Sequence, residues 1–318
     1  MTVLMKNALK YSPEILDKIA QLESICGRDV GRGIQPLVQI AKGGLLATAC
    51  SIAEHPEPHV AIITGFFLPY ANPPAPETDG PIGCALLAAG LLRAGVPVRI
   101  VTDSLCFRAV KIALLAAGVP ASIPFDIVPV ETTTGNHQVV SSLLNFWDSL
   151  ERPISHVISI ERPGPSYDGI VRNMRGQDIT AYTAPLHILF ASEKIISVGI
   201  GDGGNELGMG NIPKEVIHQH IRHGEKIACI ITCNHLIVCG VSNWGATGLL
   251  TALSLLRPDW KSAIISGLNP KIEFRILETI VKYGPAVDGV KAVQSLSVDN
   301  LAWEFHAQVL QVTTRLMW

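Results

Sequence analysis

The chain has 318 residues, of which 48% are hydrophobic and only 16% charged, and its formal net charge at pH 7 is −2. This near-neutral balance excludes a protein that binds nucleic acid mainly through electrostatic attraction. Gly, Pro, Asn or a charged residue interrupts every apolar run before it reaches the roughly 18 residues of a membrane span, so we expect no membrane-spanning segment.

The apolar content and the cysteines indicate how the interior is built. Apolar residues in this proportion are typical of buried parallel strands packed between helices, and they leave room for a homo-oligomeric interface. The seven cysteines are odd in number and form neither a CxxC pair nor a zinc-binding spacing, so we expect reduced, mostly buried thiols. The N-terminal stretch lacks the apolar core of a secretory signal and the arginine-rich pattern of a transit peptide.

In chain order, residues 1–55 are predicted to form a helical lead-in. Ser12 and Pro13 are the start signals of a helix over 12–26, and a second helix is expected over 36–53. Strands of the buried type are then expected at 59–67, 97–102, 125–130, 156–160 and 195–200. Later helices are expected at 82–94, 105–117, 137–150, 246–256, 271–283 and 299–312. Two further apolar, strand-like segments lie at 227–232 and 235–241.

The alternation of strands and helices predicts an α/β fold with an open, mostly parallel sheet and helices on both faces. No repeat, low-complexity segment or linker divides the sequence, so residues 1–318 are expected to form a single domain. Ligands bind beyond the carboxyl ends of the strands in such sheets. Four acidic residues follow predicted strands at this position, namely Asp103, Glu131, Glu161 and Asp202. Any one of them could cap a helix or form a turn, but their shared position predicts an acidic, glycine-rich site.

The loop after the fifth predicted strand reads GIGDGGNELGMGN and is the strongest candidate site. Its glycines permit close backbone approach, so the N–H groups of Gly203, Gly204 and Asn205 could bind an anion. Asp202 and Glu206 could hold an amine or a divalent, Mg²⁺-like cation. The loop lacks both the GxGxxG spacing and the Walker lysine, so we do not expect NAD or ATP. The alternative is a mobile glycine-rich turn that binds nothing.

A second candidate stretch covers 161–178 and is rich in acids and arginines. Its charged and amide residues include Glu161, Arg162, Asp168, Arg172, Asn173, Arg175 and Asp178. Arginine recognises carboxylate or phosphate through paired N–H donors, so we expect this loop to clamp an anionic substrate. The alternative is a surface loop whose ion pairs satisfy one another.

The segment PETDGP at 76–81 is the third candidate. Thr78 or Asp79 could simply cap the helix that begins near residue 82. Equally, Glu77 and Asp79 could line a site in front of that helix N-terminus, which favours anions. The sequence leaves both interpretations open.

Four motifs, PETDGP, ERPG with NMRG, GIGDGGNELGMGN and SNWG, occur in this order and resemble the C-terminal domain family of D-glutamate cyclases. The resemblance extends over roughly residues 10–312. It implies a lyase of the mitochondrial matrix that dehydrates D-glutamate to 5-oxo-D-proline, and it adds Asn243, in SNWG, to the expected site. Vertebrate members carry a further N-terminal domain that resembles a hydro-lyase family, so which half performs the chemistry stays open.

Roles for that reaction follow from the residue types. We expect Arg175, with Arg172, to hold the α-carboxylate and Glu161 or Asp168 to act as the base. The loop 202–206 would stabilise the oxyanion through its N–H groups or a bound cation. The expected catalytic residues are therefore Glu161, Asp168, Asp202 and Glu206, of which Asp202 and Glu206 are also the expected metal ligands. The expected substrate-binding residues are Glu77, Asp79, Arg172, Asn173, Arg175, Asp178, Gly203, Gly204, Asn205 and Asn243.

Two other functions fit the same residues. A metal-dependent hydrolase or phosphatase-like enzyme would use the acidic pocket with a divalent ion to cleave an ester. A non-catalytic module of a two-domain enzyme would bind an anionic metabolite for a catalytic partner domain. The sequence does not separate these functions from the hydro-lyase, and it indicates neither stereospecificity nor oligomeric state.

Overall fold

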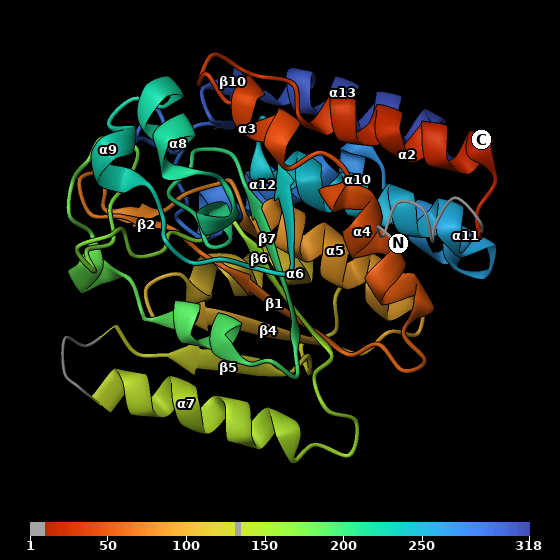
Figure 1. The fold of residues 1–318 in the computed structure, drawn as a ribbon, viewed down its shortest axis with the longest axis horizontal. Helices are drawn as coiled ribbons and strands as arrows, with labels where there is room; N and C mark the ends of the chain where they lie inside the picture. Colours follow the sequence, from red (N-terminus) through yellow and green to blue (C-terminus); the bar gives the residue numbers. More distant parts are fainter. Residues whose placement is uncertain (1–9, 131–134) are drawn as a thin grey trace.

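The computed structural model describes residues 10–130 and 135–318 and is built around a six-stranded sheet (Figure 1). Its strands are β1 (Val60–Thr64), β4 (Val98–Asp103), β5 (Phe125–Val128), β6 (His156–Ile160), β7 (Ile196–Gly201) and β8 (His235–Val238). Their order in the sheet is β5-β4-β1-β6-β7-β8, and every neighbouring pair is parallel. The chain runs outward from β1 to one edge and then returns to the other side of β1. This reversal creates a switch point between β1 and β6, where ligands bind in sheets of this order.

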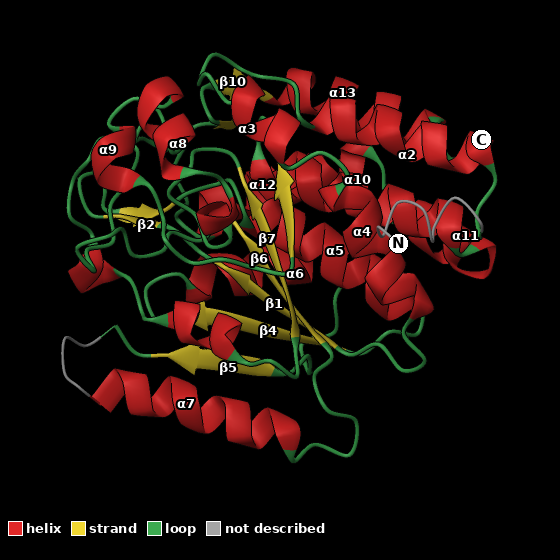
Figure 2. Ribbon diagram, in the orientation of Figure 1, coloured by secondary structure: helices red, strands yellow, loops and turns green. Residues whose placement is uncertain are grey.

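Four helices cover one face of the sheet (Figure 2). They are α4 (Gly44–Glu54), α5 (Pro81–Arg93), α6 (Phe107–Ala116) and α10 (Ser242–Leu256). All 15 residues of α10 are buried, and none is charged. A helix that is buried on every side needs neighbours around its whole circumference, and α10 contacts α2, α4, α5, α11 and α13.

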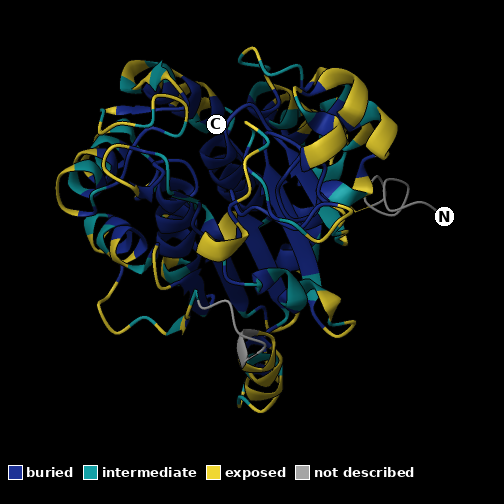
Figure 3. Cartoon of the chain, turned by 90° about the vertical axis from the view of Figure 1, so that its left-hand side faces the viewer, coloured by how far each residue is buried: buried dark blue, intermediate teal, exposed yellow. Residues whose placement is uncertain are grey.

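The opposite face is covered by α7 (Gly135–Asp148) and the 3-10 segment Leu186–Ala191. Successive side chains of a strand point to opposite faces, so Ile62 packs under α5 and its neighbours whereas Ile63 packs on the α7 side. The indole of Trp147 anchors α7 in this second core. Figure 3 shows the result, a buried sheet between helices whose outer surfaces are exposed.

The remaining elements surround this framework. The other helices are α2 (Pro13–Cys26), α3 (Gln35–Ile40), α8 (Lys214–His220), α9 (Gly224–Ile227), α11 (Pro258–Ile265), α12 (Pro270–Tyr283) and α13 (Trp303–Arg315). Two antiparallel ladders pair β2 (Phe67–Leu68) with β3 (Ala75–Pro76) and β9 (Ser297–Val298) with β10 (Leu301–Ala302). Helices α2 and α13 pack side by side along one edge of the molecule (Figure 1), so residues from the two ends of the chain approach each other.

The predicted fold class, an open α/β sheet with helices on both faces, is confirmed, whereas several element boundaries differ. The helix expected over 36–53 is two helices, because Gly43 adopts a left-handed φ of 92° between them. The strand expected over 59–67 ends earlier, because Gly65 turns the chain with a φ of 120°. A Cβ at Gly65 would lie 2.6 Å from that of Cys106, so glycine is required there.

Differences later in the chain have equally local causes. The strand-like segment 227–232 follows α9 without joining the sheet, because the N–H groups of Cys229 and Ile230 bond to loop carbonyls instead. The last helix begins at Trp303, because Asp299 and Asn300 adopt positive φ values of 54° and 64° in the turn before it. Glu131, expected at the end of a strand, lies outside the described residues.

The expectations about cysteines and membranes are consistent with the structure. All seven cysteines are free, and all but Cys233 are buried. Within 10–130 and 135–318, no helix combines the length and the hydropathy needed to cross a membrane.

A buried ion pair connects the ends of β1, β4 and β6. Asp103, the last residue of β4, lies 2.5 Å from the guanidinium of Arg162, and both side chains are buried. Arg162 also donates to the carbonyls of Gly65 (2.7 Å) and Ala184 (2.8 Å). Asp103 therefore neutralises a structural arginine instead of facing a ligand.

We expect Asp103→Asn to lower the free energy of unfolding by about 3–5 kcal/mol, because the Arg162 charge would stay buried without its partner. The amide keeps the oxygen that accepts the Cys106 N–H. Asp148→Asn is the matched control, because Asp148 pairs with Lys194 on the surface and such pairs contribute less than about 1 kcal/mol. Urea unfolding followed by circular dichroism measures both. Equal losses in the two variants would contradict this account.

Candidate active site

A cavity of about 310 Å³ opens beyond the carboxyl ends of β6 and β7. The acids in its wall are Glu77, Glu161, Asp202 and Asp299, and its cations are Arg32, Arg175 and Arg222. The four acids are buried, whereas Arg175 and Arg222 are exposed. The cavity therefore has an acidic inner wall and a cationic rim.

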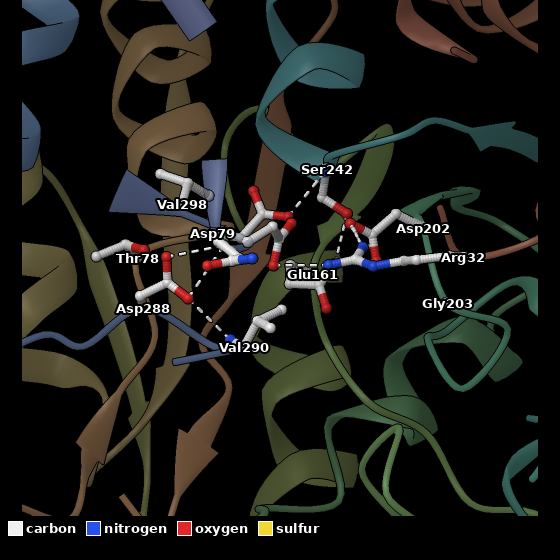
Figure 4. A network of polar contacts seen from close by, with 12 residues as sticks. Arg32, Thr78, Asp79, Glu161, Asp202, Gly203, Ser242, Asp288, Val290 and Val298 are labelled. Carbon is white, nitrogen blue, oxygen red and sulfur yellow. Dashed lines mark hydrogen bonds and ion pairs between the residues drawn. The ribbon is translucent and has the colours of Figure 1, made fainter. Parts of the chain in front are cut away.

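The buried cation of the site is Arg32, which was not among the residues expected from the sequence. Its guanidinium forms one ion pair with Asp202 (Figure 4). It forms a second ion pair with Asp299, at 2.7 Å. The loop that carries Arg32 is held by Asp29, whose carboxylate accepts N–H bonds from Gly31 (2.9 Å) and from Arg32 itself (2.8 Å). The local signal was an aspartate followed by two glycines, typical of a tight turn, but nothing local indicated where the arginine points.

Asp79 and Asn243 cap each other's helices. The Asp79 carboxylate accepts the N–H groups of Ser242 (2.8 Å) and Asn243 (2.9 Å) at the start of α10. In return, the Asn243 side-chain oxygen accepts the N–H groups of Gly80 (3.0 Å) and Gly83 (2.6 Å) at the start of α5. This exchange explains why α10 starts four residues before its predicted beginning. Burial raises the pKa of Asp79 to about 8.

Glu161 follows β6 directly and is held in an unusual backbone conformation. Its φ of 47° is left-handed, which costs a non-glycine residue roughly 1–2 kcal/mol and often marks a functional position. The Ser242 hydroxyl donates to its Oε2 at 2.5 Å (Figure 4). Burial, together with the nearby carboxyls of Asp202 and Glu206, raises the pKa of Glu161 well above its usual range. The raised pKa favours the protonated form of Glu161.

The glycine loop is closed on itself by Glu206. The Glu206 carboxylate accepts the N–H groups of Asp202 (3.0 Å), Gly203 (2.6 Å) and Gly204 (2.7 Å). Two of these N–H groups, those of Gly203 and Gly204, were expected to bind an anion, and Glu206 itself does not line the cavity. The structure therefore places Glu206 in a supporting role and does not support an oxyanion site at these N–H groups. A buried carboxylate is the natural occupant of such a backbone nest.

The expected metal ligands are also separated by this arrangement. Asp79, Glu161 and Asp202 each present an oxygen within 4.8 Å of the others, whereas Glu206 is not part of this group. Arg32 is ion-paired with Asp202 and already supplies positive charge at this cluster. Burial raises the pKa of Asp202 well above its usual range, and the arginine opposes that rise.

The arginine-rich loop divides into a surface part and a cavity part. Asp168 pairs with Arg172 at 2.6 Å, and neither residue lines the cavity. Asp178 is exposed and accepts the Thr180 N–H at 2.8 Å. For these three expected site residues, the structure matches the alternative of a surface loop with satisfied charges.

Arg175 and Asn173 do line the cavity. The Arg175 guanidinium donates to the Val290 carbonyl at 2.8 Å and lies over the Tyr70 ring, 4.7 Å from its centre. The Asn173 side-chain oxygen accepts the Arg175 N–H at 2.9 Å and so fixes the turn. Asn205 supports the same loop by donating from its side chain to the Arg172 carbonyl at 2.9 Å.

Residues 22–313 match the sequence family described as D-glutamate cyclase-like, C-terminal. The human protein D-glutamate cyclase, mitochondrial, is 35% identical to this chain over 323 residues, an alignment that covers 92% of the chain. The chain spans about half of that relative, 51% of its length.

The acidic wall makes stability depend on pH. Burial, with Asp299, Asp79 and Asp288 nearby and Arg32 only partly compensating, raises the pKa of Glu77 well above 4.5. The folded state therefore holds a proton that the unfolded state releases, and this stabilisation is lost as the pH rises through the folded pKa. We expect wild type to lose up to about 1.4 kcal/mol per pH unit more than Glu77→Gln above pH 5.

Urea unfolding at pH 5, 6, 7 and 8 measures this difference. Glu57→Gln is the control, because Glu57 is exposed, and its curve should parallel that of wild type. Parallel curves for wild type and Glu77→Gln would show that Glu77 is ionised in the folded protein.

Proposed function

Because the chain belongs to the D-glutamate cyclase-like C-terminal family, we propose that it is a hydro-lyase that cyclises D-glutamate to 5-oxo-D-proline with release of water. The observation that carries the proposal is the distribution of charged side chains in the cavity, with acids buried in its wall and arginines exposed at its rim. Its volume of about 310 Å³ is at the small end of ligand sites, which span about 300–1,000 Å³. Such a cavity suits a small molecule that carries both an ammonium and carboxylates.

The reaction needs proton transfer in both directions. A bond forms between the amine nitrogen and the γ-carboxyl carbon, and a C–O bond of that carboxyl breaks. The ammonium gives up two protons and the departing oxygen receives two, so it leaves as water and no net proton is exchanged with solvent. Two carboxyl groups, one protonated and one ionised, can perform both transfers.

Glu161 fits the role of the proton donor. Its raised pKa favours the protonated form, and the Ser242 hydroxyl and the left-handed backbone fix its orientation. A donor held in a single geometry loses little entropy on reaching the transition state. The proton acceptor comes from the acids that pair with Arg32, namely Asp202 and Asp299, because a neighbouring guanidinium favours a carboxylate.

The rim arginines fit the α-carboxylate. Arg175 is already oriented by the Val290 carbonyl and the Tyr70 ring. Arg222 lines the same rim and is exposed. Guanidinium groups bind carboxylates through two parallel N–H bonds, so the rim selects an amino acid over a simple amine.

A metal-dependent hydrolase is the alternative that one observation favours, because oxygens of Asp79, Glu161 and Asp202 lie within 4.8 Å of one another. A divalent ion there would have to compete with Arg32 for Asp202. Assays of ester hydrolysis and of 5-oxoproline formation, each before and after EDTA, separate the two functions. The non-catalytic alternative would bind D-glutamate without turnover.

The proposal concerns the half of the human relative that this chain matches. The name of that relative places it in mitochondria, and we propose the same location for this chain on that ground alone.

We expect the purified chain to form 5-oxo-D-proline from D-glutamate and Glu161→Gln to lower kcat by about 10²–10⁴-fold, the contribution of a positioned acid or base. Chromatographic detection of 5-oxoproline measures the rate, and calorimetry checks that the variant still binds D-glutamate. Glu57→Gln, on the surface, is the control with unchanged kcat. Full activity in Glu161→Gln would exclude Glu161 as the donor.

Replacing Arg175 with Met should raise the KM for D-glutamate by about 10–100-fold, because one charge-assisted contact to the α-carboxylate is lost. The effect on kcat should be smaller, since the clamp contacts a carboxylate that is not itself changed in the reaction. Initial rates over a range of D-glutamate concentrations give both constants. An unchanged KM would remove Arg175 from the clamp.

A further inference from the structure

Three buried carboxyl oxygens in the cavity wall have no hydrogen-bond partner among the described residues. Oδ2 of Asp202 is in an ion pair with Arg32, which leaves Oε1 of Glu77 and Oδ2 of Asp299 without a partner of either kind. Glu77 is only 6% exposed, and the Asp299 side chain only 5%. A buried polar atom without a partner costs about 1–3 kcal/mol, so its presence in a cavity wall points to a ligand that supplies the missing bond.

Neighbouring residues fix the positions of both carboxyls before a ligand binds. Glu77 lies against Gly289, where an added Cβ would be 2.2 Å from Oε2, so Gly289 makes room for it. The Oδ1 of Asp299 is in an ion pair with Arg32, and its Oδ2 has no hydrogen-bond partner among the described residues. The turn that carries Asp299 is held by Asp288, which accepts the Asn300 N–H at 2.9 Å.

The two oxygens define the chemistry of the missing group. Carboxyl oxygens accept hydrogen bonds, and a bound cation favours the ionised form of a carboxyl, so a positively charged hydrogen-bond donor fits this pair. Arg32 is engaged with Asp202 and Asp299, and the other cavity arginines lie at the rim. A divalent cation of the Mg²⁺ or Ca²⁺ type needs about six oxygen ligands, many more than this pair offers. A primary ammonium, a compact charge with three donors, fits two acceptors of this kind.

We propose that Glu77 and Asp299 form the subsite for the ammonium group of the amino-acid substrate. The assignment rests on the proposed function and adds the orientation of the substrate to it. The ammonium lies at the inner wall, the α-carboxylate meets Arg175 at the rim, and the side-chain carboxyl is left for Glu161.

Calorimetric titrations with two ligands of equal chain length test the subsite. D-glutamate carries the ammonium, whereas glutarate has the same two carboxylates and no amine. Glu77→Gln should weaken D-glutamate binding by about 10–100-fold and leave glutarate binding unchanged, because only the amine contact is lost. Arg175→Met is the matched contrast and should weaken both ligands, since both carry carboxylates.

A second variant moves Glu77 without removing its carboxyl group. Gly289→Ala places a methyl group against Oε2 and pushes the carboxyl from its position. It should reproduce the selective loss of D-glutamate binding. Urea unfolding of each variant confirms that the protein titrated is folded.

The outcomes separate the subsite from the reaction. One outcome is that wild type binds D-glutamate but Glu77→Gln weakens the binding of both ligands or of neither. This outcome overturns the subsite and leaves the proposed function standing. Wild type that does not bind D-glutamate overturns both. Should glutarate be too weak to measure, 5-oxo-D-proline, which also lacks an ammonium, replaces it in the same comparison.

Discussion

A single buried guanidinium makes the acidic cavity compatible with a folded protein. Arg32 pairs with Asp202 and Asp299 and interacts electrostatically with Glu161 and Asp79. An unpaired buried charge costs several kcal/mol, so these acids can share one cavity only if some are neutralised by the cation and others stay protonated. The same arrangement places carboxyls whose pKa is raised by burial beside a cation that favours ionised ones. That combination is what acid–base chemistry on an amino acid requires.

The mutual capping of α5 and α10 connects the cavity to the helices that cover the sheet. Asp79 and Asn243 fix the two helix N-termini against each other, and the neighbouring Ser242 hydroxyl then reaches Glu161. Gly80 allows this contact, because a Cβ there would lie 2.9 Å from the Glu161 Cβ. The helix packing and the orientation of the proton donor are therefore set by one group of contacts.

Local sequence patterns predicted the parts of this protein that depend on local physics. Runs of β-branched residues predicted the buried strands. Glu161 and Asp202, which follow β6 and β7, were predicted as site residues because parallel strands end at a common edge of the sheet. Arg32 and Asp299 escaped prediction, because their meeting depends on how distant segments pack. Glu206 was assigned to the site on composition, although the backbone of its own loop binds it.

The packing of α2 against α13 has a consequence for how the protein is made. Arg32 follows α2, and Asp299 lies just before α13, so the ion pair in the cavity joins opposite ends of the chain. On the ribosome, Arg32 emerges long before Asp299 exists, and contacts between distant residues form late in folding. The sheet can therefore begin to assemble co-translationally, whereas the cavity is completed only after release of the C-terminal segment.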